Sequence, residues 1–332
     1  MSSTHTITPG KLAGLRALSD HRGVIAAAAM DQRGSLKKSL AKEKGVAEMP
    51  DSALVEFKEL VTEVLTKHAS AILLDPEFGL PASHRRNGKG LLLAYEKTGY
   101  DANTPGRLPD LLDVWSVRRL AEAGADCIKI LLYYTPFDKP SVNEFKHAWI
   151  ERIGDECIAH DIPFFLEFVG YDADGGDEKS VEYARKKPSI VEGAMVEFSK
   201  PRYNVDVLKV EVPIVMEHVA GTKAFKGESA YSREDALKLF KSVGECTSKP
   251  FIYLSAGVSN PVFIETLELA GESGVTFNGV LCGRATWKDG IPIYAKQGAD
   301  AFKQWLDTVG VENIENVNKA LQAATPWKSK VE

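Results

Sequence analysis

The amino-acid sequence predicts an α/β fold, a single (β/α)8 TIM barrel, and three observations lead to this prediction. Short apolar runs recur eight times along the 332 residues, and helix-like segments lie between them. Such alternation is typical of a parallel sheet covered by helices. Eight units in a chain of this length fit a closed barrel. The turn Met30–Gly34 lacks the glycine-rich phosphate sequence of the alternative, a doubly wound open sheet.

The predicted strands are dominated by Val, Ile, Leu and Ala, as expected for parallel strands that are buried on both faces. Their length of four to eight residues separates them from the longer helical segments. In chain order they are Val24–Met30, Ala71–Leu74, Gly90–Tyr95, Cys127–Tyr133, Pro163–Val169, Val205–Val212, Pro250–Ala256 and Gly279–Cys282.

The predicted helices carry apolar residues at the three- and four-residue spacing of an amphipathic helix. In chain order they are Leu54–Lys67, Leu111–Ala123, Ala148–Ala159, Val191–Phe198, Ala236–Val243 and Pro261–Ala270. Pro261 stands at the start of its segment, where helices tolerate proline. The segment Gly170–Lys187 is charged and rich in glycine, so we expect it to form a long loop after the fifth strand.

We expect one domain over residues 1–332, because no linker-like segment divides the chain. Residues 1–22 precede the first strand as an N-terminal extension, and residues 325–332 form a C-terminal tail. The start of the chain has no apolar stretch of the signal-peptide type, and no run reaches the roughly 18 apolar residues of a membrane span. We therefore expect a cytoplasmic protein that has no membrane partner and that forms a homo-oligomer.

The net charge and the positions of cysteine, histidine and aspartate residues limit the partners and cofactors that the protein could have. The net charge of −5 argues against a nucleic-acid partner but allows a small anionic ligand. Cys127, Cys157, Cys246 and Cys282 form no C-x-x-C pair. His84 and His218 follow the second and sixth strands without a third histidine, and Asp172, Asp174 and Asp177 lack the terminal glutamate of a calcium-binding loop. We therefore predict neither a metal ion nor another cofactor.

Three ionisable residues lie inside consecutive predicted strands, where apolar side chains are expected. Lys129, Glu167 and Lys209 can meet if all point into the barrel, because neighbouring strands are only about 4.8 Å apart. Burial and a second cation both favour the neutral form of Lys209, which is a nucleophile able to form a Schiff base with a ketone. Glu167 can transfer protons, and Asp31 at the end of the first strand can act as a further base.

This cluster also has a structural interpretation. Lys209 could reach solvent or pair with Glu211, or the two lysines and Glu167 could form a buried ion-pair network that only fixes strand register. Such networks are often no more stable than apolar packing. Perturbed ionisable groups also gather at functional sites. The sequence therefore favours the catalytic interpretation.

A second constellation follows the seventh and eighth strands and predicts a phosphate site. Ser255 and Gly257 end one strand, and Gly283 and Arg284 end the next. Barrel enzymes frequently bind phosphate with these two loops. Small residues let backbone N–H groups approach an anion, and arginine grips two oxygens at once. Read separately, the glycines could be tight turns and Arg284 a partner in a surface salt bridge.

Four long stretches closely resemble the tagatose 1,6-diphosphate aldolase family: Ile72–Ser83, Leu91–Asp101, Val205–Pro213 and Phe277–Trp287. The similarity runs from about Gly23 to the final helix. This family consists of class I, metal-independent aldolases on a (β/α)8 barrel. The resemblance implies cleavage of tagatose 1,6-bisphosphate, and of fructose 1,6-bisphosphate as well, to dihydroxyacetone phosphate and glyceraldehyde 3-phosphate.

The resemblance also implies roles for individual residues. Lys209 matches the Schiff-base lysine, Glu167 the proton-transferring glutamate and Lys129 the second active-site lysine. Asp31 and Gln32 match a pair beside the substrate hydroxyls. Ser255 and Arg284 match the site of the ketose 1-phosphate. Candidates for the distal phosphate are Arg33, Arg85, Arg86, Lys89 and Lys97.

Departures from the family pattern leave alternatives for the substrate. The stretch Phe168–Asp172 replaces the expected Leu-Thr-Tyr-Asp, and a polar residue is expected near Val215. A related barrel aldolase acts on 6-deoxy-6-sulfofructose 1-phosphate, so a sulfonated ketose is one alternative. A metal-dependent aldolase or isomerase, or a non-catalytic regulatory barrel, are others.

Overall fold

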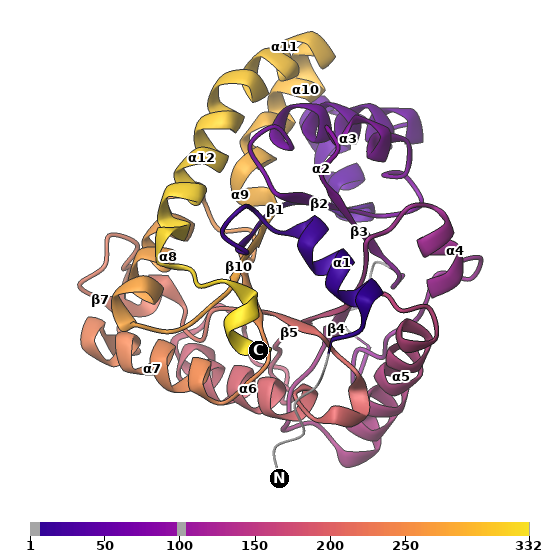
Figure 1. Ribbon diagram of the computed structural model, residues 1–332. Coiled ribbons are helices and arrows are strands. Elements are labelled where there is room, and N and C mark those ends of the chain that lie inside the picture. Colours follow the sequence, from indigo (N-terminus) through magenta and orange to yellow (C-terminus); the bar gives the residue numbers. More distant parts are fainter. Residues whose placement is uncertain (1–6, 98–103, 332) are drawn as a thin grey trace.

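The chain folds into a closed barrel of eight parallel strands (Figure 1), which confirms the predicted architecture. The computed structural model describes residues 7–97 and 104–331. Residues 1–6 of the N-terminal extension, residues 98–103 at the end of the stretch Leu91–Asp101, and residue 332 lie outside the described residues. No helix in the described part of the chain is long and apolar enough to cross a membrane.

The barrel strands closely match the predicted apolar runs. They are β1 (Ile25–Met30), β2 (Ala71–Leu74), β3 (Gly90–Ala94), β4 (Cys127–Tyr133), β5 (Phe164–Val169), β6 (Val207–Val210), β9 (Phe251–Leu254) and β10 (Gly279–Cys282). The register between β1 and β10, with Ala28 opposite Cys282, closes the barrel. A two-residue pair, β7 (Val219–Ala220) with β8 (Tyr231–Ser232), lies in the connection after β6.

Helices surround the barrel in Figure 1. They are α1 (Pro9–Leu18), α2 (Gly34–Lys44), α3 (Asp51–Leu65), α4 (Val117–Glu122), α5 (Pro140–Ala159), α6 (Val181–Phe198), α7 (Arg233–Glu245), α8 (Asn260–Ser273), α9 (Arg284–Trp287), α10 (Ile291–Gln297), α11 (Ala299–Trp305) and α12 (Val311–Ala320).

Several predicted bounds were wrong, among them the start of the helix Ala148–Ala159, which begins at Pro140. The segment Leu111–Ala123 is helical only from Val117, because Leu111 pairs with Glu96 in an antiparallel bridge. The expected loop Gly170–Lys187 ends early, since α6 already begins at Val181. There the Ser180 side chain accepts a hydrogen bond from the backbone N–H of Tyr183, which caps the helix.

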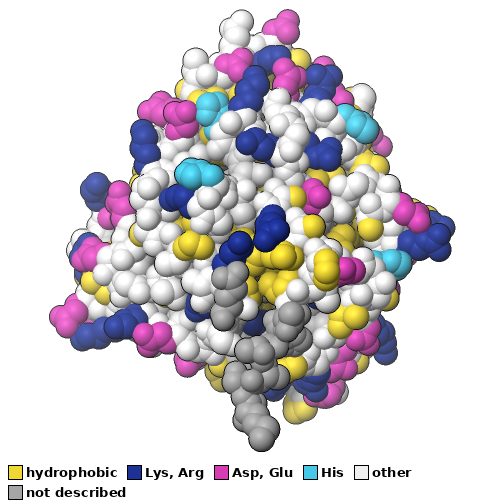
Figure 2. Space-filling model, viewed as in Figure 1, with side chains coloured by type: hydrophobic (Ala, Val, Ile, Leu, Met, Phe, Trp, Pro, Cys, Tyr) yellow, Lys and Arg dark blue, Asp and Glu magenta, His cyan; other side chains and the backbone are white. Residues whose placement is uncertain are grey.

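The amino end of the barrel is filled and covered. Alternate strand residues, among them Ile25, Leu92 and Val207, form an apolar interior with Leu15 and Leu18 of α1. Trp327 joins this cluster at 1% exposure, and its indole N–H donates to Ser19 Oγ at 2.8 Å. In Figure 1 α1 lies across the middle of the barrel, and acidic and basic side chains are interspersed over the same face in Figure 2.

The carboxyl end of the interior is charged instead of apolar. Side chains along a strand alternate between its two faces, so residues two positions apart point the same way. Ala29 faces the interior, which places Asp31 on the interior side, and Phe165 does the same for Glu167. Each of these strands therefore changes from small or apolar to ionisable as it approaches its carboxyl end.

Candidate active site

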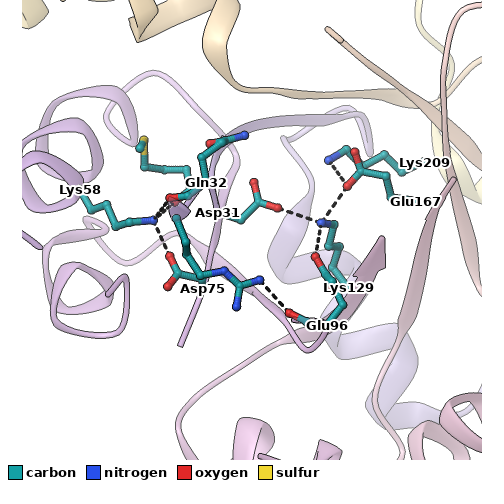
Figure 3. A network of polar contacts seen from close by, with 10 residues as sticks. Asp31, Gln32, Lys58, Asp75, Glu96, Lys129, Glu167 and Lys209 are labelled. Carbon is teal, nitrogen blue, oxygen red and sulfur yellow. Dashed lines mark hydrogen bonds and ion pairs between the residues drawn. The ribbon is translucent and has the colours of Figure 1, made fainter. Parts of the chain in front are cut away.

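Three adjacent strands bring Lys129, Glu167 and Lys209 together (Figure 3), in the arrangement expected from the sequence. The register places Glu167 on β5 directly opposite Lys209 on β6. The Nζ of Lys209 donates to Oε2 of Glu167 at 2.8 Å, and the Nζ of Lys129 lies 2.9 Å from the same oxygen. One carboxylate oxygen is thus shared by two ammonium groups.

Lys129 is fully buried and holds three carboxylates. Besides Glu167, its Nζ lies 2.8 Å from Oδ2 of Asp31 and 2.8 Å from Oε1 of Glu96. Burial alone would lower the pKa of Lys129, but the negative charges of the carboxylates raise it well above its usual value. Lys129 is therefore a fixed cation at neutral pH.

The carboxylates of Asp31 and Glu167, which both contact Lys129, are held ionised. Burial would raise the pKa of Asp31 and of Glu167, but the charges of Lys129 and Lys209 lower both below their usual values. The side chains of Asp31, Glu167 and Lys209 keep 12%, 8% and 4% of their exposure, whereas Lys129 keeps none. Both bases and Lys209 thus reach the mouth of the barrel, with Lys129 sealed behind them.

Glu96 belongs to this network, although the sequence analysis did not include it. It lies two residues after the end of β3, and burial raises the pKa of its carboxyl group. Its Oε2 has no hydrogen-bond partner among the described residues. A signal was available in the sequence, because Glu96 has the same strand parity as Leu92 and Ala94, which face the interior.

The alternative partner for Lys209, Glu211, is engaged elsewhere. Its Oε1 lies 3.2 Å from Lys187 Nζ, and its Oε2 accepts a hydrogen bond from the backbone N–H of Gly170 at 2.7 Å. Lys209 pairs with Glu167 instead. The alternative in which Lys209 pairs with Glu211 was therefore wrong.

The residues predicted to bind phosphate come together after β9 and β10. Ala256 and Gly257 both have positive φ, 47° and 76°, which turns the chain sharply. A Cβ built on Gly257 would lie only 2.7 Å from Cζ of Arg284, so the guanidinium group lies against this glycine. Ser255 is buried beside them, and Arg284 is exposed. The arrangement presents a guanidinium group next to a tight backbone turn.

Gln32 lies between the turn that holds Gly257 and Arg284 and the charged network that contains Asp31. A Cβ built on Gly283 would lie 3.6 Å from its Nε2, so the amide lies beside the end of β10. The Oε1 of Gln32 is buried and has no hydrogen-bond partner within the described parts of the chain. An unpartnered buried acceptor at the edge of a site is suited to a ligand hydroxyl.

The candidates for a distal anion divide into two groups. Arg33 and Lys97 line a cavity of about 430 Å³ at the carboxyl end, with Glu77 and Asp113 as their ion-pair partners. The other three are far from it. Lys89 directly precedes β3 at the amino end, Arg86 donates to the Lys89 carbonyl, and Arg85 pairs with Glu63 of α3.

The histidines and the acidic loop do not form a metal centre. Both ring nitrogens of His218 lie near backbone carbonyls, those of Glu228 at 2.8 Å and Lys179 at 3.1 Å. Asp172 forms an ion pair with Lys186. Within residues 7–97 and 104–331, no three His, Cys, Asp or Glu side chains are grouped so that they could hold a metal ion.

Comparison with solved structures agrees with the fold. A fructose-bisphosphate aldolase from Plasmodium falciparum superposes with a TM-score of 0.67 at 15% identity, covering 94% of each chain. A Schiff-base-forming fructose-1,6-bisphosphate aldolase gives a TM-score of 0.56 at 14% identity, covering 89% of this chain and 98% of that one. At such low identity these similarities support the barrel fold alone.

Comparison of sequences is more specific. A tagatose 1,6-diphosphate aldolase of Enterococcus faecalis is 54% identical over 330 residues, covering 98% of both chains. A tagatose 1,6-diphosphate aldolase of Listeria monocytogenes is 52% identical over 326 residues, covering 98% of this chain and 95% of its own. The family model for DeoC/LacD family aldolases matches residues 25–289. With this match over most of the barrel, the chain belongs to the DeoC/LacD aldolase family.

Proposed function

We propose that this aldolase cleaves tagatose 1,6-bisphosphate to dihydroxyacetone phosphate and glyceraldehyde 3-phosphate through a Schiff base on Lys209. The observation that carries the proposal is the buried Lys209, whose Nζ lies 2.8 Å from the carboxylate of Glu167. Two relatives with more than half of their residues identical are named for this substrate. Fructose 1,6-bisphosphate, which differs in the configuration of one hydroxyl group, is expected to react as well.

The first half of the reaction forms the imine. Lys209 passes a proton to Glu167 and attacks the C2 ketone as a neutral amine, which gives a carbinolamine. Glu167 then returns a proton to the C2 hydroxyl, water leaves, and a protonated imine remains. The positive charge of Lys129 lowers the pKa of Glu167, so the carboxyl group is ionised before it takes the first proton and gives that proton back readily.

The second half breaks the carbon–carbon bond. Asp31 takes the proton of the C4 hydroxyl, and its lowered pKa means that it is ionised and ready to do so. As the C4 aldehyde forms, the C3–C4 bond breaks and its electron pair moves to the imine nitrogen. Glyceraldehyde 3-phosphate leaves, the enamine is protonated at C3, and water releases dihydroxyacetone phosphate from Lys209.

Binding groups around the two phosphates and the hydroxyls complete the proposal. Arg284, lying against Gly257, supplies two N–H donors to the 1-phosphate. Gln32 Oε1 accepts from a substrate hydroxyl, which gives this buried oxygen a partner. Arg33 and Lys97, at the cavity next to β3, receive the distal phosphate in exchange for Glu77 and Asp113.

Borohydride reduction in the presence of dihydroxyacetone phosphate tests the mechanism. We expect irreversible loss of activity and a peptide map that places the reduced adduct on Lys209. An adduct on another lysine would overturn the assignment. EDTA should leave turnover unchanged, whereas loss of activity that zinc restores would favour a metal-dependent aldolase.

A comparison of substrates tests the specificity. We expect the highest kcat/KM for tagatose and fructose 1,6-bisphosphates. Preference for 6-deoxy-6-sulfofructose 1-phosphate would assign the chain to sulfonated ketoses, and no turnover of any of them would favour a regulatory barrel. The homo-oligomer stays a prediction, which light scattering checks.

A further inference from the structure

Besides Lys129 and Lys209, a further buried lysine lies close to the active site, on a helix outside the barrel. Lys58 belongs to α3, its side chain is fully buried, and its Nζ reaches the carboxyl end of β1. There it donates to the backbone carbonyls of Met30 and Gln32, at 2.8 Å each, and to the carboxylate of Asp75. These contacts lie beside the catalytic network in Figure 3.

The two carbonyl groups that Lys58 binds lie on either side of Asp31. This residue stands after the last residue of β1, where the regular hydrogen bonds of the barrel end. Without a further contact, the backbone at such a position is free to rotate and to carry its side chain away from Lys129. Lys58 holds the chain before and after Asp31 and thereby fixes the direction of the carboxylate.

Asp75 in turn fixes Lys58. Both side chains have no exposure, and Asp75 also accepts a hydrogen bond from the backbone N–H of Phe78 at 2.8 Å. Asp75 follows β2, whose Leu74 pairs with Met30 of β1. The ammonium group therefore ties together the ends of two neighbouring strands, and it satisfies its hydrogen bonds without facing the substrate.

We propose that Lys58 is the positioning residue for Asp31, holding its carboxylate where it can take the proton of the substrate C4 hydroxyl. This inference rests on the proposed function, in which Asp31 acts only in the bond-breaking half of the reaction. Lys58 therefore affects cleavage and leaves imine formation on Lys209 intact. A buried lysine that only stabilised the fold would affect both halves alike.

The experiment compares the two halves of the reaction in Lys58→Met, which keeps the length of the side chain and removes its charge. We expect kcat for cleavage of fructose 1,6-bisphosphate to fall about 10²-fold, the effect of misplacing a catalytic group by about 1 Å. KM should change little. Borohydride trapping of dihydroxyacetone phosphate on Lys209 should proceed at the wild-type rate.

The pH profile provides a second measurement. The charge of Lys58 contributes to the lowered pKa of Asp31, after the larger contributions of Lys129 and Lys209. Removing it should move the acid limb of kcat to higher pH, because Asp31 then gains its proton more readily. In an Asp31→Asn background, Lys58→Met should cause no further loss of kcat, since both changes affect the same step.

Lys11→Met is the matched control. Lys11 forms the corresponding buried ion pair at the amino end, with Nζ 2.8 Å from Oδ2 of Asp206, and lies away from the catalytic network. This variant should lose thermal stability and keep kcat. If Lys58→Met does not fold, Lys58→Met/Asp75→Leu removes both charges together, which proteins often tolerate, and the same fall in kcat is expected.

Three outcomes would overturn the inference: unchanged kcat in the folded Lys58 variants, equal losses in cleavage and imine trapping, or additive losses with Asp31→Asn. Failure of the proposed function is recognised separately. In that case wild-type protein itself forms no trapped adduct on Lys209, whatever happens at position 58.

Discussion

The two ends of the barrel are formed by the same eight strands but differ in their side chains. The interior is apolar at the amino end and charged at the carboxyl end. At the amino end, Trp327 and α1 cover an apolar interior, and the ion pair Lys11–Asp206 is complete in itself. Asp206 accepts two hydrogen bonds from Lys11 and one from the backbone N–H of Phe164. At this end, the ammonium group of Lys11 and the carboxylate of Asp206 neutralise each other's charge.

At the carboxyl end the charges are shared and unevenly matched. Lys129 binds three carboxylates, while Glu167 offers a single oxygen to two lysines. The Oε2 of Glu96 has no partner among the described residues. The comparison shows that the pair at the amino end uses its hydrogen-bonding groups on itself, whereas the network at the carboxyl end leaves an acceptor over, as the proposed function requires.

The largest expected effect on kcat comes from replacing a buried lysine by methionine at the carboxyl end, compared with the same replacement at the amino end. Lys209→Met should lower kcat on the order of 10⁶-fold, as removal of a covalent nucleophile does elsewhere. Lys11→Met should leave kcat close to wild type and lower the melting temperature. Steady-state kinetics and thermal unfolding of both variants check this contrast, and substantial turnover by Lys209→Met would remove the distinction between the ends.

Glu167→Gln is the next largest change. The amide keeps the size of the side chain and removes the base, so kcat should fall about 10²–10⁴-fold with little change in KM. Glu211→Gln is a matched control, because Glu211 is also buried near the carboxyl end but pairs with Lys187. Near-normal turnover by the Glu167 variant would reduce Glu167 to a structural partner of the lysines.

Arg284→Ala should act on substrate binding more than on the chemical steps. We expect KM for fructose 1,6-bisphosphate to rise sharply, and kcat/KM for fructose 6-phosphate, which lacks the 1-phosphate, to change much less. Arg85→Ala is the control, since Arg85 is an exposed arginine paired with Glu63 away from this turn. Equal losses on both substrates would mean that Arg284 is not the 1-phosphate ligand.

The smallest expected effect concerns how stability depends on pH. The contributions of Asp206 at the amino end and Asp31 at the carboxyl end should change in opposite directions as pH falls. Burial raises the pKa of Asp206, so its contribution to stability is greatest below the unfolded value of about 3.9 and is lost as pH rises through the folded pKa. Lys129 and Lys209 outweigh burial and lower the pKa of Asp31, so its contribution is present above about 3.9 and is lost as pH falls.

Melting temperatures between pH 3 and pH 6 measure this difference. As pH falls, wild type should gain stability relative to Asp206→Asn and lose stability relative to Asp31→Asn. The changes should stay within a few degrees, because a chain of this size shifts by about 2–4 °C or less per kcal/mol. The same sign for both variants would show that the two ends respond alike to protonation.

The sequence predicted the barrel well because its signal is local. Each strand is a short apolar run, and the runs Ala71–Leu74, Cys127–Tyr133 and Gly279–Cys282 coincide with strands in the structure. Helix bounds were harder. Pro188 lies inside α6 and interrupts the apolar pattern there, so the start of the helix at Val181 was missed.

The clearest sequence signal for the site came from residues that interrupt an apolar strand. Lys129, Glu167 and Lys209 stand out in this way, whereas Glu96 and Lys58 do not. Lys58 lies on the apolar stripe of α3, four residues after Leu54 and three before Val61, but a lysine within a helix is ordinarily exposed. Its contacts with the carbonyls of Met30 and Gln32 at the carboxyl end of β1 depend on how α3 packs on the barrel, which the sequence alone does not specify.

The shared oxygen of Glu167 has a consequence for the energy of turnover. When the proposed imine forms, the three N–H donors of the Lys209 ammonium group are reduced to the single N–H of a protonated imine. A carboxylate with Lys209 as its only partner would then lose most of its hydrogen bonding. Because Lys129 holds the same oxygen at 2.9 Å, Glu167 keeps a counter-ion throughout the cycle. The surroundings then need little reorganisation between successive intermediates, which is the condition under which fixed charges accelerate a reaction most.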